Sequence, residues 1–457
     1  MTPSPFQVAI VKGGIFVLWA ILTALDAFLV FLNRVLSKAD AIIGDNVDSE
    51  KRSRVVIVGA SFAGVSAYRD LIRHSRRGEL EITIIEYKAF FEYVPGILRS
   101  FVDPAHFNSL TCSLDYMNND GRGTKFVQGN VVEVDRKSNI VKLQSGRTIP
   151  YDYLILATGS TYPGPIKATV QQRSLSARQR QINKMADEIE SAETVCIVGA
   201  GAVGVELAAE IADNYPPSKK RIVLIDLCST ILPGFPEGNK RYCRRWLEKN
   251  GVELMLGTSL KSISKKSVTF PDGTKLQADI VFKCIGPAPA TAFLKDDSSF
   301  SQALRGPKAA TIANKHLQVD GFDNIFCAGD VCYLPTIDEL NLGHTACLNG
   351  SFVALNVLRM VRDDPGLLLY PKGLYGNDQT PKIVNVSLGK YDASLRFNGL
   401  EIHGSLPAIL KWKIEWTQIA AAANRPVGRL FWIFADWMSF FLSRTILPTP
   451  TAKTKLA

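Results

Sequence analysis

The chain lacks the residue clusters that mark several common functions. It has no paired Cys-x-x-Cys motifs, so we expect neither a zinc site nor another metal centre. It also has no lysine- and arginine-rich arm, so the formal net charge of +10 favours an acidic membrane surface or an anionic cofactor over nucleic acid. The eight cysteines are scattered, which is typical of free thiols in a reducing compartment.

Two similar glycine-rich stretches occur in the chain, VVIVGASFAGVSA (55–67) and VCIVGAGAVGVELAAEI (195–211). Each predicts a strand, a tight turn and a helix, followed by a second strand that ends in an acid. Such glycines let the backbone approach a dinucleotide pyrophosphate at the helix N-terminus, and the acid accepts hydrogen bonds from the ribose. The equivalent positions of the two copies are Gly59, Gly64 and Glu86 in the first and Gly199, Gly204 and Asp226 in the second.

A further match extends the repeat. Residues 141–159 align without gaps with residues 268–286. The spacing between the two copies is 13 residues shorter here than at the glycine motifs, so the first copy contains 13 extra residues, around 90–130. We therefore predict an α/β protein with two Rossmann-like domains, the second inserted into the first. The predicted parts are 1–50 (apolar membrane segment and linker), 54–165 and 289–360 (first dinucleotide domain), 166–288 (second dinucleotide domain) and 361–457 (C-terminal region).

Residues 14–32 form the longest apolar run, GIFVLWAILTALDAFLVFL, whose 19 residues approach the roughly 20 that cross a bilayer. Asp26 opposes a simple span, since an acid near the helix centre costs about 2.5–3.5 kcal/mol on insertion. Trp19, Thr23, Asp26 and Asn33 are expected on one side of the helix, which allows a helix in the membrane interface or one packed on a partner. A buried core helix is the third interpretation.

A second apolar segment, 428–447, contains Trp432 and Trp437 and is flanked by arginines. This pattern is typical of a helix at a membrane interface, although a helix docked on the protein's own core has a similar composition. Arg34 and Lys38 follow the first apolar run and favour a main body on the cytosolic side. The organelle stays open, with the mitochondrial outer membrane as one candidate.

The stretch NIFCAGDVC (324–332) predicts a strand followed by a Gly-Asp turn, and with the two glycine motifs it resembles the two-dinucleotide-binding-domain flavoprotein family. That family includes glutathione-reductase-like enzymes, type II NADH dehydrogenases and apoptosis-inducing-factor-like proteins. The resemblance implies FAD in the first domain and NADH or NADPH in the second. It implies Gly59, Ser61, Gly64, Glu86, Thr158, Gly159 and Asp330 for FAD, and Gly199, Gly201, Gly204, Glu206, Asp226 and Gly286 for the nicotinamide nucleotide. Ser61 departs from the glycine expected there.

Three longer stretches, 90–102, 145–160 and 314–331, resemble the branch that contains the apoptosis-inducing factor 2 (ferroptosis suppressor) proteins. Members of that branch are NAD(P)H:quinone oxidoreductases at membranes, so the resemblance implies a quinone substrate. Disulfide reductases of the wider family carry a cysteine pair on the helix after the first turn. The corresponding helix, 62–73, has no cysteine, so electrons are expected to leave to a diffusing acceptor.

Several residues have a proposed role and a structural alternative. We expect Glu206 to orient the nicotinamide carboxamide, and His344 to be a candidate proton donor or else a capping or packing residue. Arg99 is expected near the flavin, or in a plain salt bridge. Asp226 favours NADH because its charge repels a 2′-phosphate, unless the nearby Arg221 compensates.

Two other functions stay open at this stage. One is an NADH-dependent reductase of a soluble acceptor, such as an iron–sulfur protein or the ascorbate radical, for which an acidic partner would suit the positive charge. The other is a redox-gated signalling flavoprotein of the apoptosis-inducing-factor type. Acceptor specificity separates the first from quinone reduction, whereas slow turnover with every acceptor would favour the second.

Overall fold

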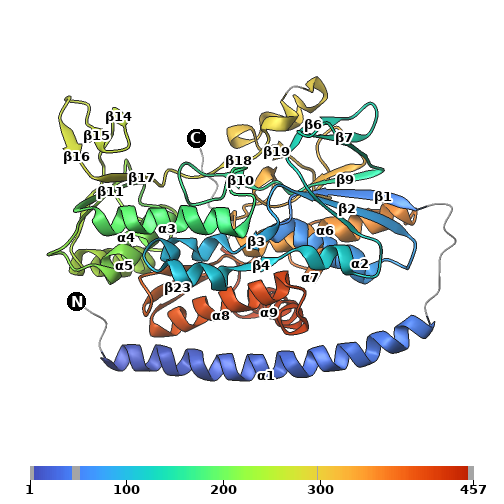
Figure 1. Cartoon of the computed structure of the whole chain (residues 1–457), viewed down its shortest axis with the longest axis horizontal. Coiled ribbons are helices and arrows are strands. Elements are labelled where there is room, and N and C mark those ends of the chain that lie inside the picture. The colour runs from blue at the N-terminus through green and yellow to red at the C-terminus, as the bar shows by residue number, and fades with distance from the viewer. Residues whose placement is uncertain (1–4, 44–51, 296, 451–457) are drawn as a thin grey trace.

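A five-stranded parallel sheet, in the order β20-β9-β1-β2-β5, forms the first half of the core. The computed structural model describes residues 5–43, 52–295 and 297–450 (Figure 1). The central strand β1 reads SRVVIV and is buried over its last four residues, as expected of a parallel strand covered on both faces. The strands are β1 (Ser53–Val58), β2 (Leu80–Glu86), β5 (Lys125–Gln128), β9 (Tyr153–Leu156) and β20 (Ile325–Cys327).

A second parallel sheet, in the order β13-β12-β11-β17, repeats the plan of the first. Its strands are β11 (Thr194–Val198), β12 (Arg221–Ile225), β13 (Val252–Met255) and β17 (Ile280–Lys283). Because β20 returns to pair with β9 after the second sheet is complete, the second unit is an insertion in the first. The α/β fold expected from the repeat is therefore confirmed, while the predicted domain boundaries stay a prediction.

Helices flank both sheets, and small residues bring two of them close together. A Cβ atom at Gly350 of α6 would lie 2.1 Å from the carbonyl oxygen of Ala63 in α2, so glycine allows the two backbones to touch. The helices are α2 (Phe62–His74), α3 (Leu175–Ser191), α4 (Ala202–Asn214), α5 (Glu237–Lys249) and α6 (Gly343–Val361).

Each parallel sheet carries a small antiparallel sheet that corresponds to the second sequence match. The first is β6 (Val131–Asp135), β7 (Ile140–Leu143) and β8 (Thr148–Pro150), and the second is β14 (Ser262–Ile263), β15 (Ser267–Thr269) and β16 (Lys275–Gln277). The extra residues of the first copy form β3 (Phe90–Glu92), β4 (Thr111–Ser113) and the 3-10 segments Val94–Phe101 and Pro104–Leu110. Short pairings join β10 (Ser160–Thr161) to β18 (Ala288–Pro289) and β19 (Thr311–Ile312) to β21 (Cys332–Tyr333).

The C-terminal region is an antiparallel sheet followed by a helical hairpin. After the short helix α7 (Lys372–Tyr375) come β22 (Ile383–Ser387), β23 (Ala393–Phe397) and β24 (Leu400–Gly404). Helices α8 (Ser405–Ala422) and α9 (Pro426–Thr445) are joined by three residues and therefore pack on each other.

Helix α1 (Pro5–Ile43) runs along α8 and α9 at one side of the molecule (Figure 1). Among the described residues it is the one helix long and apolar enough to cross a membrane, over Val8–Val30, and only a small share of that stretch is buried. Leu22 packs with Ala420 and Val427. The exposed apolar side of α1 argues against the buried core helix, and leaves the membrane and interface alternatives.

The described residues on the predicted polar side of α1 differ in their exposure. Asp26 is buried and faces Arg425 with an N–O distance of 3.5 Å, whereas Trp19 is 48% exposed. The reason is that Asp26 turns toward the start of α9, where a cation compensates its charge. The side chains of Asn33, Arg34 and Lys38, and the linker residues 44–51, lie outside the described part of the chain.

Candidate functional site

The first glycine turn is shaped by two close backbone approaches. Gly59 has a φ of +105°, and a Cβ atom there would lie 2.2 Å from the carbonyl oxygen of Ala157. A Cβ at Gly64 would lie 1.8 Å from the carbonyl oxygen of Gly59. Only glycine fits both positions, so the start of α2 is held against the ends of β1 and β9 and its amides point out of the sheet edge. Ser61 stands at the N-cap of α2 but makes no side-chain capping bond.

Glu86, the acid at the end of β2, stabilises this turn through hydrogen bonds to backbone amides. Oε2 of Glu86 accepts a hydrogen bond of 2.8 Å from the backbone amide of Ala60, and Oε1 accepts one of 3.3 Å from the amide of Lys88. Glu86 is buried and also lines a cavity beside the turn. Its carboxylate therefore fixes the turn and is presented to whatever occupies the cavity.

The second turn repeats this geometry. A Cβ at Gly204 would lie 1.8 Å from the carbonyl oxygen of Gly199, as at the first turn. Oδ2 of Asp226 accepts a 2.5 Å bond from the amide of Ala200, and Oδ1 accepts a 2.7 Å bond from the amide of Cys228. At Gly201, where the first copy has Ser61, a Cβ would meet no atom within 4 Å. The space in front of the second turn is therefore open to a ligand.

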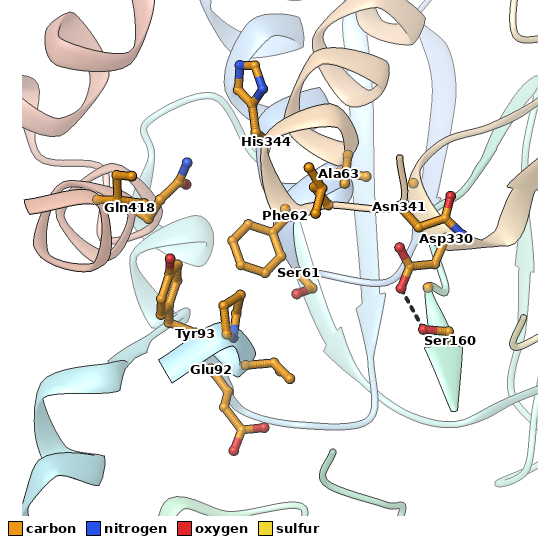
Figure 2. Close-up of a pocket in the computed structure, with 18 of the residues that line it drawn as sticks. Ser61, Phe62, Ala63, Glu92, Tyr93, Ser160, Asp330, Asn341, His344 and Gln418 are labelled. Atoms are coloured by element: carbon orange, nitrogen blue, oxygen red, sulfur yellow. Dashed lines mark hydrogen bonds between the residues drawn. The ribbon is translucent and has the colours of Figure 1, made fainter. Parts of the chain in front are cut away.

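A cavity of about 640 Å³ connects the first turn to the C-terminal helices. One end contains Ser61, Glu86, Thr158, Gly159 and Asp330. Residues of the 3-10 segment after β3, of α4, and of α8 and α9 also line the cavity. Figure 2 shows Asp330 and Ser160 at the right, Gln418 and Tyr93 at the left, His344 at the top and Phe62 near the centre.

Asp330 occupies the Gly-Asp turn at the cavity wall. Its Oδ2 accepts a 2.5 Å hydrogen bond from Ser160 and lies 3.3 Å from Nζ of Lys167. The amide of Gly329 donates to Oδ1 of Asn349 in α6, which fixes the turn against that helix. Sequence reasoning missed Lys167 because it lies in an irregular segment with no motif of its own.

Glu206 reaches the cavity from α4 and contacts the C-terminal region. Both of its hydrogen bonds within the described chain are accepted by Oε1, from the amide of Ser387 and from Nζ of Lys411, each at 2.8 Å. Lys411 belongs to α8 and was not predicted, because the two residues are 205 positions apart. The carboxylate is thus held in place while it lines the cavity.

His344 is the second residue of α6 and lines the other half of the cavity. Its Nε2 lies 2.7 Å from Oδ1 of Asp436, and its ring lies 6.0 Å from that of Trp432. Leu342 occupies the N-cap position, so His344 is not a capping residue. Asp436 was missed, although an acid inside the aromatic segment 428–447 was a signal that could have identified it.

Three further residues that were predicted for the site, Arg99, Gly286 and Asp226, are not among the residues that line the cavity. Arg99 makes a buried ion pair with Glu210 at 2.9 Å and also donates to the carbonyl of Gly389, which is the salt-bridge alternative, and it does not line the cavity. This carboxylate raises the pKa of Arg99 even though burial opposes the charge. Gly286 lies beside Pro287, which does line the cavity, and Asp226 stands apart at the second turn.

Two parallel sheets, each with a glycine turn and a supporting acid, define a protein that binds two dinucleotides. Residues 53–350 match the pyridine nucleotide-disulphide oxidoreductase family, and the chain belongs to that family. It is an FAD-dependent oxidoreductase that uses NAD(P)H, as expected from the sequence. The open space before Gly201, the cavity at the first turn and the Gly-Asp wall fit these cofactors.

Similar proteins come from distant organisms. The chain is 28% identical over 387 residues to ferroptosis suppressor protein 1 of Taeniopygia guttata, covering 81% of this chain and 95% of that protein. It is 26% identical over 387 residues to apoptosis-inducing factor homolog A of Dictyostelium discoideum, covering 80% and 90%.

Two solved structures have a similar fold. The sulfide:quinone oxidoreductase of Aquifex aeolicus matches with a TM-score of 0.69 at 17% identity, covering 87% of this chain and 96% of that one. The NDH2 of Plasmodium falciparum in complex with NADH matches with a TM-score of 0.64 at 14% identity, covering 88% and 100%.

Proposed function

We propose that the protein is a membrane-bound NADH:quinone oxidoreductase. The observation that carries this proposal is the lining of the cavity, a passage that joins residues of the first glycine turn with residues of α8 and α9. A small apolar acceptor can enter such a passage from the side of the helices. The name of one solved structure also supports a quinone acceptor, because a sulfide:quinone oxidoreductase shares the fold.

In this proposal the first sheet holds FAD. The amides at the start of α2 face the pyrophosphate, Ser61 adds a hydroxyl, and Glu86 binds the ribose while it supports the turn. Asp330 binds the ribityl chain of FAD, and Lys167 and Ser160 hold the Asp330 carboxylate in place. Gly59, Gly64, Thr158 and Gly159 complete the wall. Bound there, FAD would accept a hydride from NADH and pass two electrons to the acceptor.

The second sheet holds NADH in this scheme. Gly199, Gly201, Gly204 and Gly286 form the bed for its pyrophosphate, and Asp226 bonds the ribose hydroxyls. Glu206 orients the carboxamide of the nicotinamide, because Lys411 and Ser387 fix its carboxylate at the cavity wall. The N-terminus of α6 points its positive end into the same cavity and stabilises negative charge there.

Attachment to the membrane is assigned to α1 together with α9. Their exposed aromatic residues include Phe16, Trp19 and Phe28 on α1 and Phe434, Trp437 and Phe441 on α9. Aromatic side chains of this kind bind at the interface between headgroups and acyl chains. The ion pair of Asp26 with Arg425 holds α1 against the start of α9, which argues for a helix lying on the membrane. In this arrangement α1 would reach about 58 Å along the surface.

The test is rapid mixing of the NADH-reduced protein with competing acceptors. We expect the flavin absorbance to recover much faster with ubiquinone in liposomes than with oxygen, and a soluble short-tailed ubiquinone to react without liposomes. Fast recovery with an iron–sulfur protein or the ascorbate radical, while quinones are inert, would replace this proposal by the soluble-acceptor reductase. Slow recovery with every acceptor would favour the signalling flavoprotein.

A further inference from the structure

Two buried nitrogen atoms in side chains that line the cavity have unmet hydrogen-bonding capacity. Within the part of the chain that the structure describes, neither Nε1 of Trp432 nor Nδ1 of His344 has a hydrogen-bond partner. Both side chains line the cavity, and their ring centres are 6.0 Å apart. A buried polar group without a partner costs about 1–3 kcal/mol, so two such groups beside one cavity indicate a ligand that bonds both.

The chemistry of the two nitrogens restricts what that ligand is. The indole N–H of Trp432 can only donate a hydrogen bond. Nε2 of His344 is held by the carboxylate of Asp436 at 2.7 Å, which places a proton on Nε2. Nδ1 is then an acceptor when the ring is neutral and a donor when the ring is protonated. A carbonyl oxygen that accepts from both groups therefore requires the imidazolium form.

We infer that Trp432 and His344 bind one carbonyl oxygen of the quinone, and that His344 delivers a proton to it. This inference rests on the proposed quinone reduction. The proton moves from Nδ1 to the carbonyl oxygen, the C=O group becomes C–OH, and Nδ1 becomes an acceptor for the new hydroxyl. The two electrons and the other proton come from NADH, so that NADH, quinone and one proton give NAD⁺ and quinol. His344 recovers its proton from water, and Asp436 acts as a positioning residue.

The two sides of helix α9 differ, because one side lines the cavity and the other side is exposed. Trp432, Asp436 and Ser439 lie on the side of α9 that lines the cavity, whereas Phe434 and Trp437 lie on the exposed side. Trp437 is 49% exposed and is stacked on Phe441. It is therefore a matched control for Trp432, because it is the same residue type on the same helix but outside the cavity.

The first experiment measures binding without turnover. Titration calorimetry of the oxidised full-length protein in detergent, without NADH, gives the Kd of ubiquinone-1. Loss of one hydrogen bond predicts that Trp432→Phe raises this Kd about fivefold to tenfold, whereas Trp437→Phe leaves it unchanged. The flavin content of each variant is measured first, so that a loss of fold is not mistaken for a loss of affinity. Equal Kd values for wild type and Trp432→Phe would overturn the inference.

The second experiment separates proton delivery from electron transfer. His344→Gln should lower kcat with ubiquinone-1 about a hundredfold and leave both the NADH half-reaction and the reduction of ferricyanide, which needs no proton, close to wild type. Asp436→Asn should change the tautomer of His344 in the nitrogen NMR spectrum of histidine-labelled protein. Equal losses with ferricyanide and quinone, or an unchanged tautomer, would contradict these roles. A wild-type protein inert toward all quinones would instead remove the proposed function itself.

Discussion

Replacing Asp226 by asparagine should reduce the preference for NADH over NADPH about tenfold while keeping the second glycine turn intact. The carboxylate has two structural bonds, from the amides of Ala200 and Cys228. Asparagine keeps one acceptor oxygen for the turn but loses the charge. Alanine keeps neither oxygen, so the buried amide of Ala200 would lose its partner, and the affinity for both coenzymes should fall.

The magnitude follows from the charge that the 2′-phosphate of NADPH would bring beside Asp226. Two like charges about 5 Å apart repel by about 1–3 kcal/mol for effective dielectric constants between those of water and a protein surface. This corresponds to a discrimination of about fivefold to 150-fold in kcat/KM, and a tenfold change on removing the charge lies within that range. The comparison is made at one ionic strength, because salt screens the repulsion.

Arg221 provides the control. It stands at the first position of β12 and pairs with Glu253 through two bonds of 2.8 and 2.9 Å. Asp226 follows the other end of that strand, about 16 Å away at the usual rise per residue. Arg221→Ala should therefore leave the coenzyme ratio unchanged when kcat/KM is measured with ferricyanide. The reasoning would be refuted by a wild type that prefers NADPH, or by an Arg221→Ala variant that changes the ratio as much as Asp226→Asn.

Three further predictions concern flavin binding, attachment and stability. Asp330→Ala should lose most of the FAD on gel filtration, and full flavin occupancy would remove Asp330 from the site. A chain starting at residue 51 should keep its FAD and its ferricyanide activity but no longer float with liposomes; failure to fold would show that α1 is part of the core. Burial raises the pKa of Glu339 from 4.5 to about 6, so the folded state binds this proton more tightly than the unfolded chain. Stability should fall by up to about 2 kcal/mol as the pH rises from 4.5 through 6, and Glu339→Gln should flatten this part of a denaturant-measured pH profile.

The repeated unit was predictable because its signals are local. The first strand, glycine turn and helix lie between Ser53 and His74, and the glycines at 59 and 64 are dictated by close backbone contacts. The second sequence match likewise corresponds to three-stranded antiparallel sheets in both halves. The acids Glu86 and Asp226 were predicted to bind the ribose, and that stays a prediction. Their bonds to the turn amides were not foreseen, because sequence spacing does not reveal which atom a carboxylate contacts.

The parts that sequence reasoning missed all involve contacts across long separations. Lys167 contacts Asp330, Lys411 contacts Glu206, and Asp436 contacts His344, and each pair joins segments that are far apart in the sequence. Trp432 and Trp437 were treated alike, in a helix either at the membrane interface or docked on the core, because both lie in one aromatic run. Helical periodicity separates them onto two sides, but only the packing of α9 on α8 decides which side faces the cavity.

The position of α9 also bears on which acceptor suits the enzyme. A soluble protein acceptor needs an opening on a polar surface, where charged side chains can steer it. Here Phe431, Trp432 and Ile414 line the cavity, and the other side of α9 exposes Phe434 and Trp437. A lipid-borne acceptor would pass these apolar side chains and could bond to His344 and Trp432, which both line the cavity. Those groups then bind the one polar end of a quinone, which is why its headgroup, rather than its tail, should decide the affinity for this site.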